Sequence, residues 1–466
     1  MRLRPTFLAV ALMLALPASA QQQAEQDPPT APTQAPEVAA VDDPDGAESV
    51  GKQVPLAEIR RFVSVYNAIR EAYVEPVADE KLMHSALRGL LLDLDPHSVY
   101  FDREAARDFN QDASGAYDGV GLELQQQPGP LLKVIAPIEG GPGDRAGLKS
   151  GDIITAIDGK PISNDDGTTP LRGAAGTSVK VTVQRQGTAK PFDVTLVRER
   201  IRLLSVRERM LEPGYGYVRI ASFQSGTADD FGKAVAALKS QSGGKLKGLL
   251  IDLRSNPGGL LNGAVQIADD LLDAGQIVST RGRLKGGDTS FSATRGDVVD
   301  GVPVVVLVDA GSASASEVLA GALADHRRAR IVGSRTFGKG SVQTLLPLDN
   351  GDAVKLTTAR YYTPSGRSIQ GVGIAPDLVL RPEGKTADAM RVSEADLRGH
   401  LRGEEEGEAM AGENAGDVLP GEAPLNSALV ELKRMAGDAS AKLPAAAPPP
   451  APPKQPEPAK VPPPVK

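Results

Sequence analysis

The sequence predicts a multidomain α/β protein. Three observations support this fold class: apolar residues recur at helical spacing in residues 55–110, short strand-like runs separated by glycine turns fill residues 111–200, and buried strands alternate with amphipathic stretches in residues 201–385. A chain of 466 residues has room for about three domains. We therefore expect an N-terminal helical module, a β-rich domain and an α/β core.

The composition excludes several classes of protein. Acidic residues outnumber basic ones by 59 to 52, for a net charge of -7, so the chain lacks the basic surface typical of nucleic-acid binding. The chain has no cysteine, which excludes disulfides, thiolate metal sites, a cysteine nucleophile and a lipidated N-terminal cysteine. We expect no nucleic-acid partner.

Both ends of the chain differ from its centre. Residues 1–20 have the pattern of a secretory signal peptide: Arg2 and Arg4, an apolar stretch too short to span a bilayer, then small residues that suit a cleavage site. Residues 21–54 predict a disordered linker, 386–440 an acidic, partly helical region and 441–466 a Pro/Ala-rich disordered tail. The signal predicts an exported, periplasmic protein that either is free or lies at the membrane periphery. Intact Met1 on cytosolic protein would contradict export.

Residues 55–110 predict the helical module. Ile59, Phe62 and Ile69 follow helical spacing, a second apolar helix covers residues 82–92, and Pro96 ends the module's helices. His97 follows this proline; it could be a ligand, but a histidine beside a proline turn is more often structural. The apolar faces of the module would suit a homodimer, although packing within the chain explains them equally well.

Residues 111–200 resemble a PDZ domain. The resemblance rests on the G-V-G-L loop at 119–122, the short helix ending at 146–148, the G-D-I-I strand at 151–154 and the turn at 158–159. It implies that Val120, Gly121 and Leu122 bind a substrate C-terminus, which would add to the sheet edge as a strand. The alternative is a glycine-rich β-turn without a ligand.

Ser314 is the candidate nucleophile of the α/β core. An apolar strand at 304–308 leads through a glycine-serine turn to a helix expected from Ser314 to about Arg328. At a helix N-terminus, unpaired N–H groups and the helix dipole can stabilise an oxyanion, which acyl transfer at a serine requires. The alternative is a capping box, in which Ser314 and Glu317 only satisfy backbone donors.

A serine nucleophile needs a base. His326 follows Ser314 by twelve residues, about 18 Å along a continuous helix, which excludes it as the direct base. Lys339 is the next candidate, because burial can lower the pKa of a lysine until it accepts a proton. It lies between Gly338 and Gly340 after a returning strand at 330–333. The alternative is a solvated loop lysine.

These residues belong to a set of motifs that resembles the carboxy-terminal processing, or tail-specific, serine proteases. The motifs include LDPHS at 94–98, DLRSNPGG at 252–259, SASASE at 312–317, TFGKGSVQ at 336–343 and YYTPSGRSIQ at 361–370, and the resemblance covers nearly all of 55–385. It implies a serine-lysine peptidase with an α/β core of the crotonase/Clp-protease-like type and no cofactor.

The resemblance assigns roles to individual residues. It makes Ser314 the nucleophile, Lys339 the general base and Gln343 the partner that orients the lysine; four residues apart, Lys339 and Gln343 would share a face of one helical turn. The oxyanion hole would use the amide of Ala315 and a glycine amide, from either Gly258 or Gly259.

Two further residues have supporting roles in this resemblance. Asp325 matches an acidic position that is structural or supportive. Arg172 matches a PDZ arginine through which a bound peptide shifts an inactive arrangement into an active one; the alternative is a solvated surface arginine. Residues 164–170 contain Gly and Pro where the family has a helix, which alters the expected peptide groove.

Together these features predict an exported endopeptidase that captures exposed C-termini of unfolded or tagged proteins, with an adaptor lipoprotein as a further candidate partner. No metal or nucleotide is expected: the chain has no H-E-x-x-H, and the sequence from Gly333 to Lys339 continues with Gly340 where a P-loop needs Ser or Thr. The alternative functions are a non-catalytic PDZ-type adaptor and, from the proline-rich tail alone, a polymer-binding structural protein.

Overall fold

The computed structural model describes residues 54–127, 129–162, 167–283, 288–382, 392–405 and 415–438. The predicted signal peptide, nearly all of the predicted linker and the Pro/Ala-rich tail lie outside these residues. In the ranges above, no helix has the length and apolarity required to cross a bilayer. The chain divides into two compact units, Met1–Asp79 and Glu80–Lys466.

The first unit contains α1 (Leu56–Ala72). None of its residues is buried, and its exposed side chains include Ile59, Phe62 and Ile69. The apolar stripe of an amphipathic helix is normally buried against another element. Nothing in its own unit buries the stripe of α1 in the described residues.

The predicted helical module, residues 55–110, does not correspond to either unit. The second helix, α2 (Asp79–Leu92), starts at their boundary. It is followed by β1 (Val99–Phe101), which pairs antiparallel with β18 (Ala353–Tyr362), and by α3 (Arg103–Ser114). The end of the predicted module therefore forms part of the α/β core, because the pairing of β1 with β18 holds it there.

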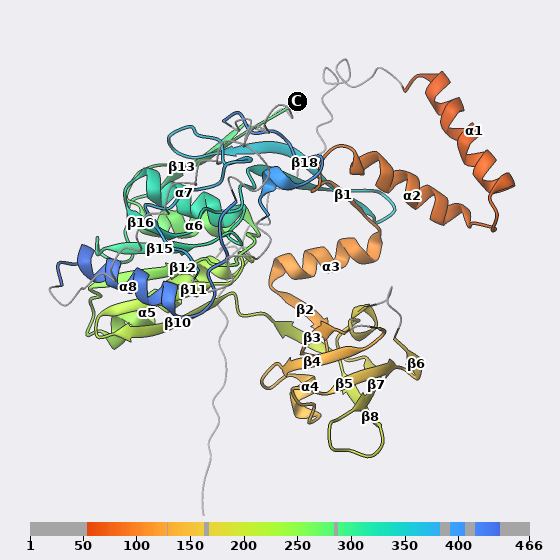
Figure 1. Cartoon of the computed structure of the whole chain (residues 1–466), viewed down its shortest axis with the longest axis horizontal. Coiled ribbons are helices and arrows are strands. Elements are labelled where there is room, and N and C mark those ends of the chain that lie inside the picture. Colours follow the sequence, from red (N-terminus) through yellow and green to blue (C-terminus); the bar gives the residue numbers. More distant parts are fainter. Residues whose placement is uncertain are drawn as a thin grey trace, which may run out of the picture. The chain divides into compact units, whose positions relative to one another are not determined.

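A β-rich domain follows α3 (Figure 1). Its sheet has the order β3-β4-β5-β7-β8, with β6 paired to β5, and β2 pairs with β9. The alternating buried residues Val179, Val181 and Val183 form its core with Val134 and Ile154. The elements are β2 (Ala116–Gly119), β3 (Leu122–Gln126), β4 (Leu132–Pro137), α4 (Pro142–Arg145), β5 (Ile153–Ile157), β6 (Lys160–Pro161), the 3-10 turn η2 (Thr169–Leu171), β7 (Ser178–Gln184), β8 (Phe192–Val197) and β9 (Glu199–Arg202).

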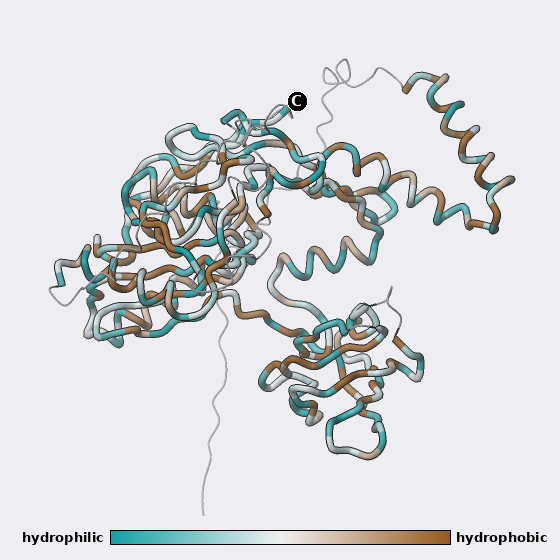
Figure 2. The backbone as a smooth tube through the Cα atoms, viewed as in Figure 1, coloured by the Kyte–Doolittle hydropathy of each residue, from teal (hydrophilic) through white to brown (hydrophobic). Residues whose placement is uncertain are grey.

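The α/β core is built on a six-stranded sheet of order β10-β11-β12-β15-β16-β19, parallel except for the edge strand β10. The strands are β10 (Val206–Glu212), β11 (Tyr215–Ile220), β12 (Gly248–Asp252), β15 (Val304–Val308), β16 (Ala329–Gly333) and β19 (Leu378–Val379). β12 and β15 are buried along their whole length, as expected for strands covered on both faces. Figure 2 shows apolar residues concentrated along these central strands.

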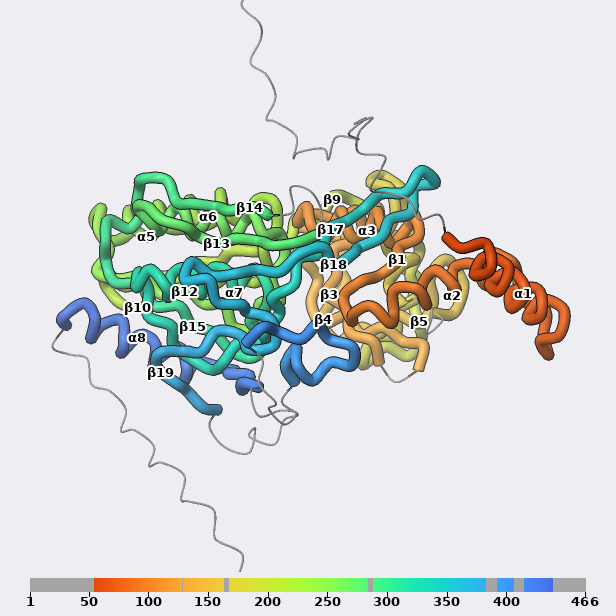
Figure 3. The backbone as a smooth tube through the Cα atoms, turned by 90° about the horizontal axis from the view of Figure 1, so that it is seen from above, coloured from red at the N-terminus to blue at the C-terminus, as the bar shows by residue number. Residues whose placement is uncertain are grey.

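Helices cover both faces of this sheet. The helices α5 (Thr227–Gln241), α6 (Leu261–Leu271) and α7 (Ala315–Asp325) pack on one face, and α8 (Ala423–Met435) packs on the other (Figure 3). A second sheet contains β1, β18, β13 (Gly275–Gly282) and β14 (Thr289–Ala293), with β17 (Ser341–Pro347) paired to β18. α6 and α7 contact β13, so they form a layer between the two sheets.

Candidate active site

Ser314 lies at the start of α7, as its sequence pattern predicts. The buried strand β15 leads into the turn before it, and Ala315 begins the helix. Its backbone has φ 54° and ψ -115°, which is unfavourable for a residue with a side chain. Such strain costs on the order of 1–3 kcal/mol and persists only where the surroundings impose it.

The Glu317 carboxylate imposes it. Oε2 accepts hydrogen bonds from the amides of Ser314 at 2.7 Å and Lys339 at 2.9 Å. Oε1 accepts from the Gly338 amide at 2.7 Å and from the Thr336 hydroxyl at 2.6 Å. The predicted capping contact of Glu317 with Ser314 is thus one of four. One fully buried side chain fixes the backbone of both candidate dyad residues together.

Burial raises the pKa of Glu317 to about 7, and the four hydrogen bonds oppose this rise. Sequence reasoning assigned this residue only to a capping box. The position of Glu317 in that motif was its signal, but the contacts with the loop of Lys339 arise between residues that are distant along the chain.

Lys339 is half-buried in the irregular segment that precedes β17. Burial lowers the pKa of its amine, and the nearby charge of Lys355 lowers it further, whereas Glu394, Glu317 and Asp95 raise it. This environment favours the neutral amine that a general base requires.

The hydroxyl of Ser314 is near a buried phenol. Burial raises the pKa of Tyr361 to about 12, and a hydrogen bond with the Ser314 side chain opposes the rise. In the part of the chain that the structure describes, no hydrogen bond joins the Ser314 hydroxyl to the Lys339 amine. The structure brings the backbones of the two residues together without forming the bond that proton transfer needs.

The prediction that Lys339 and Gln343 share a helical turn is wrong. Gln343 lies in strand β17, where it is paired with Thr357 of β18, because strand pairing with β18 determines the local conformation. Its Nε2 donates to the Ser341 hydroxyl at 3.0 Å and to the Thr357 hydroxyl at 3.3 Å. Among the described side chains, Gln343 makes no hydrogen bond with the Lys339 amine.

The loop that follows β12 contacts Ser314. A Cβ on Gly258 would lie 2.9 Å from the Ser314 Cβ, so only glycine fits there. The Gly258 amide, however, donates to the Asn256 Oδ1 at 2.9 Å. No hydrogen bond within the described ranges uses the amides of Gly259 or Ala315. Of the two glycines left open by the sequence, Gly258 lies against Ser314 with its amide in use, whereas the Gly259 amide has no partner in the described residues.

Asp325 lies at the opposite end of α7 from Ser314. It accepts a hydrogen bond from the Ser365 amide at 2.9 Å and forms an ion pair with Arg367 at 3.0 Å. These contacts secure the turn after β18.

The predicted peptide-binding residues line a groove of the β-rich domain. Val120 and Leu122 contribute to a cavity of about 240 Å³ that Tyr117 and Arg172 also line. Gly121, between them, has φ 66°, and a Cβ there would lie 3.2 Å from Pro142. Of the stretch 164–170, where the family has a helix, residues 164–166 lie outside the described residues. Thr169 and Pro170 belong to the short turn η2.

Arg172 links this groove to α3. Its guanidinium donates to the Asp112 carboxylate at 3.3 Å and lies 3.9 Å from the Asp108 carboxylate. It also stacks over the Tyr117 ring, with 5.2 Å from Cζ to the ring centroid. Arg172 is therefore a packed and paired side chain.

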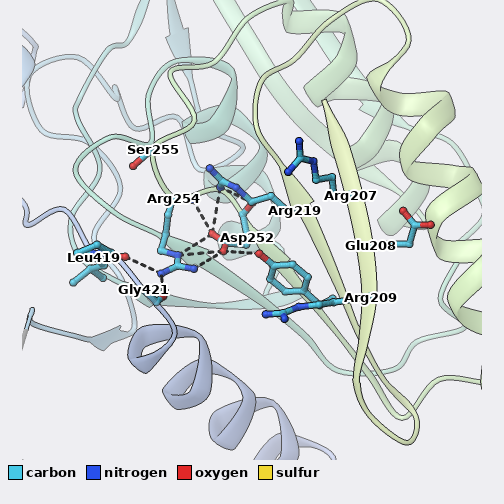
Figure 4. Close-up of a pocket in the computed structure, with 11 residues that line it drawn as sticks. Arg207, Glu208, Arg209, Arg219, Asp252, Arg254, Ser255, Leu419 and Gly421 are labelled. Carbon is cyan, nitrogen blue, oxygen red and sulfur yellow. Dashed lines mark hydrogen bonds and ion pairs between the residues drawn. The ribbon is translucent and has the colours of Figure 1, made fainter. Parts of the chain in front are cut away.

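A larger cavity, of about 500 Å³, lies at the end of β12 (Figure 4). The buried Asp252 carboxylate accepts from Arg254 at 2.7 Å and from the Tyr217 hydroxyl at 3.0 Å, and it pairs with Arg219 at 3.4 Å. Arg254 also donates to the Leu419 carbonyl at 2.7 Å. This network anchors the start of the loop that carries Gly258, and Ser314 does not line the cavity.

Comparisons with known proteins agree with these observations. Three family models match: "Peptidase family S41" at residues 214–380, "PDZ domain" at 133–185 and "Activating protease CtpB N-terminal domain" at 20–105. A carboxy-terminal-processing protease of Bartonella bacilliformis is 43% identical over 371 residues, which cover 78% of this chain and 85% of that protein. A probable CtpA-like serine protease of Staphylococcus aureus is 37% identical over 331 residues, 70% of this chain and 65% of that protein.

Among solved structures, a photosystem II D1 C-terminal processing protease is 33% identical, with a TM-score of 0.42 over 68% of this chain and 92% of that chain. The family models and the Bartonella relative confirm the predicted fold class, the PDZ domain and the peptidase activity. The chain belongs to the carboxy-terminal-processing proteases, a family of PDZ-containing serine peptidases.

Proposed function

We propose that this peptidase cleaves unfolded proteins through an acyl-enzyme at Ser314, with Lys339 as the general base. The observation that carries the proposal is the shared contact of both backbones with Glu317 Oε2. This contact supports a dyad, because it fixes the attachment points of the hydroxyl and the amine beside one another.

In the proposed reaction the neutral Lys339 amine takes the proton of the Ser314 hydroxyl as Oγ attacks the substrate carbonyl. The developing oxyanion accepts hydrogen bonds from the Ala315 and Gly259 amides, which have no partner in the described structure. The lysine then donates the proton to the leaving amine, and water hydrolyses the ester with lysine again as base. Gln343 would orient the lysine after it leaves its contacts with Ser341 and Thr357.

The position of the Lys339 side chain supports a resting state. In the described residues its amine has no hydrogen-bond partner, and the Ser314 hydroxyl is near Tyr361. We propose that a peptide in the PDZ groove promotes the active arrangement, with Arg172 as the regulatory link between groove and α3. The change required is a rotation of side chains, since Glu317 already fixes the backbone.

Recognition of a C-terminal carboxylate by Val120, Gly121 and Leu122 predicts a preference that can be measured. We expect an unfolded protein with an apolar C-terminus to be cleaved at least about tenfold faster with a free carboxylate than with a C-terminal amide, since the loss of one charge-assisted contact costs roughly 1.4 kcal/mol. Arg172→Ala should reduce this difference, and Ser314→Ala is the inactive control. Equal rates for both substrates would contradict recognition of the carboxylate. Cleavage only after a membrane extract is added would support the need for an adaptor.

We further propose that the protein is exported and forms a homodimer. The signal pattern of residues 1–20 supports export, and the exposed apolar side chains of α1 support self-association. Native mass spectrometry of protein from the periplasmic fraction is expected to give two chains, each starting at Gln21. Chains that retain Met1 would contradict cleavage of the signal, and a single-chain mass at micromolar concentration would contradict the dimer.

A further inference from the structure

The segment that carries Lys339 has no regular secondary structure. Residues 335–340 lie between β16 and β17, and Gly338 has φ 96°. Backbone groups in such a segment must be held by other parts of the chain. Glu317 accepts hydrogen bonds from the Gly338 and Lys339 amides on one side of the segment. Other residues must hold its opposite side.

Glu394 contacts that other side. Its backbone amide donates to the Phe337 carbonyl at 3.0 Å, two residues before Lys339. Its carboxylate Oε1 accepts from the Gln370 Nε2 at 3.0 Å, and the Oε1 of Gln370 accepts from the Gly340 amide at 2.9 Å. Glu394 therefore reaches the segment on both sides of Lys339, directly at Phe337 and through Gln370 at Gly340.

These contacts are buried and so are shielded from competition by water. The side chain of Glu394 is 1% exposed, and Gln370 is fully buried and also donates to the Leu401 carbonyl at 2.9 Å. His97 contacts the same carboxylate, with its Nε2 2.8 Å from Oε2. The three side chains come from the segment before β1, the segment after β18 and the turn η4 (Glu394–Asp396). Glu394 lies beyond residue 380, where the match to the peptidase family model ends.

The geometry points to Glu394 as a positioning residue for the proposed peptidase reaction: it holds the segment of residues 337–340 so that the Lys339 amine can reach Ser314. This inference rests on the proposed role of Lys339 as general base. It also assigns the described C-terminal segment, residues 392–405, a part in catalysis.

The Glu394 carboxylate also acts on Lys339 electrostatically. The charged groups that face Lys339 are Lys355 on β18, Glu317 on α7, Asp95 before β1 and Glu394, and His97 faces Glu394 in turn. Burial and Lys355 lower the pKa of Lys339, while the Glu394 charge raises it. Neutralising Glu394 should therefore lower this pKa further, and the acidic limb of the pH–rate profile should move to lower pH.

Two variants and a matched control test the inference. Glu394→Gln keeps the size of the side chain and removes its charge, whereas Glu394→Ala removes the contact with Gln370. Glu405→Gln, which changes an exposed glutamate in the same segment, is the control. The assay is cleavage of an unfolded protein across pH, together with the thermal midpoint and hydrogen exchange of residues 337–340.

For Glu394→Ala we expect kcat to fall at least about tenfold while KM stays within about twofold, and exchange in residues 337–340 to become faster. For Glu394→Gln we expect the acidic limb to move to lower pH, and Glu405→Gln should match the wild type. A wild-type kcat and pH profile in both Glu394 variants would overturn the inference, as would a lower thermal midpoint without these changes. Full activity of Ser314→Ala in the same series would instead refute the proposed mechanism itself.

Discussion

Replacing Ser314 by alanine is expected to lower kcat/KM for protein cleavage at least about 1000-fold, because the acyl-enzyme can no longer form. Lys339→Ala should cause a loss of similar size, since the proposed reaction then lacks the group that takes the serine proton. The double variant should lose little more than either single one, because the two groups act as a unit. The measurement is the initial rate of cleavage of an unfolded protein, with circular dichroism to confirm folding.

The pH dependence gives an independent check of the same dyad. Burial lowers the pKa of Lys339, but the base works only when the amine is neutral, so the rate should fall as the pH drops through that pKa. Lys339→Arg should remain inactive at every pH, because a guanidinium stays protonated. An equal rate at mildly acidic and alkaline pH, or an active Lys339→Ala variant, would contradict lysine as the base.

Replacing Glu317 by alanine is expected to lower both the thermal stability and the cleavage activity. In Glu317→Ala the amides of Ser314, Gly338 and Lys339 and the Thr336 hydroxyl lose their acceptor in a fully buried site. Each unsatisfied group costs about 1–3 kcal/mol, so the thermal midpoint should fall by roughly 10 °C. Cleavage should also be lost in the fraction that remains folded, because Ser314 and Lys339 are no longer fixed beside one another.

The control for this prediction is Glu208→Ala, which removes an exposed glutamate of the same core. Glu317→Gln separates charge from hydrogen bonding: its amide nitrogen cannot accept, so one pair of donors remains unsatisfied. A Glu317→Gln variant with wild-type stability and rate would show that the four hydrogen bonds of the Glu317 carboxylate are dispensable.

The hydrophobic pattern predicted the elements that form from local sequence. The apolar run at Val304–Val308 is β15, and the helix expected from Ser314 begins at Ala315. Such elements are predictable because burial of a continuous apolar run or stripe determines their conformation. The candidate nucleophile and base came instead from the resemblance to the tail-specific proteases, because the local pattern alone left a capping serine and a solvated loop lysine as alternatives.

The features that sequence reasoning missed depend on contacts between distant residues. Gln343 is in a strand because β18 pairs with it, and the spacing from Lys339 contains no sign of that partner. Whether the Gly258 amide is free depends on the hydrogen bond that it donates to the Asn256 side chain. Glu394 contacts His97, which lies 297 positions earlier in the chain. No local sequence pattern can indicate a contact over that separation.

The pairing of β1 with β18 has a consequence for how this enzyme can be rebuilt. Because β1 and α3 precede the PDZ domain and β10 follows it, that domain is inserted within the catalytic fold and is not appended to it. A domain exchange between relatives must therefore replace an internal block at two junctions, near residues 115 and 203. A chain shortened to begin at the PDZ domain would leave Ala353, Val354 and Lys355 of β18 with an open edge, where foreign strands can add and aggregates can grow.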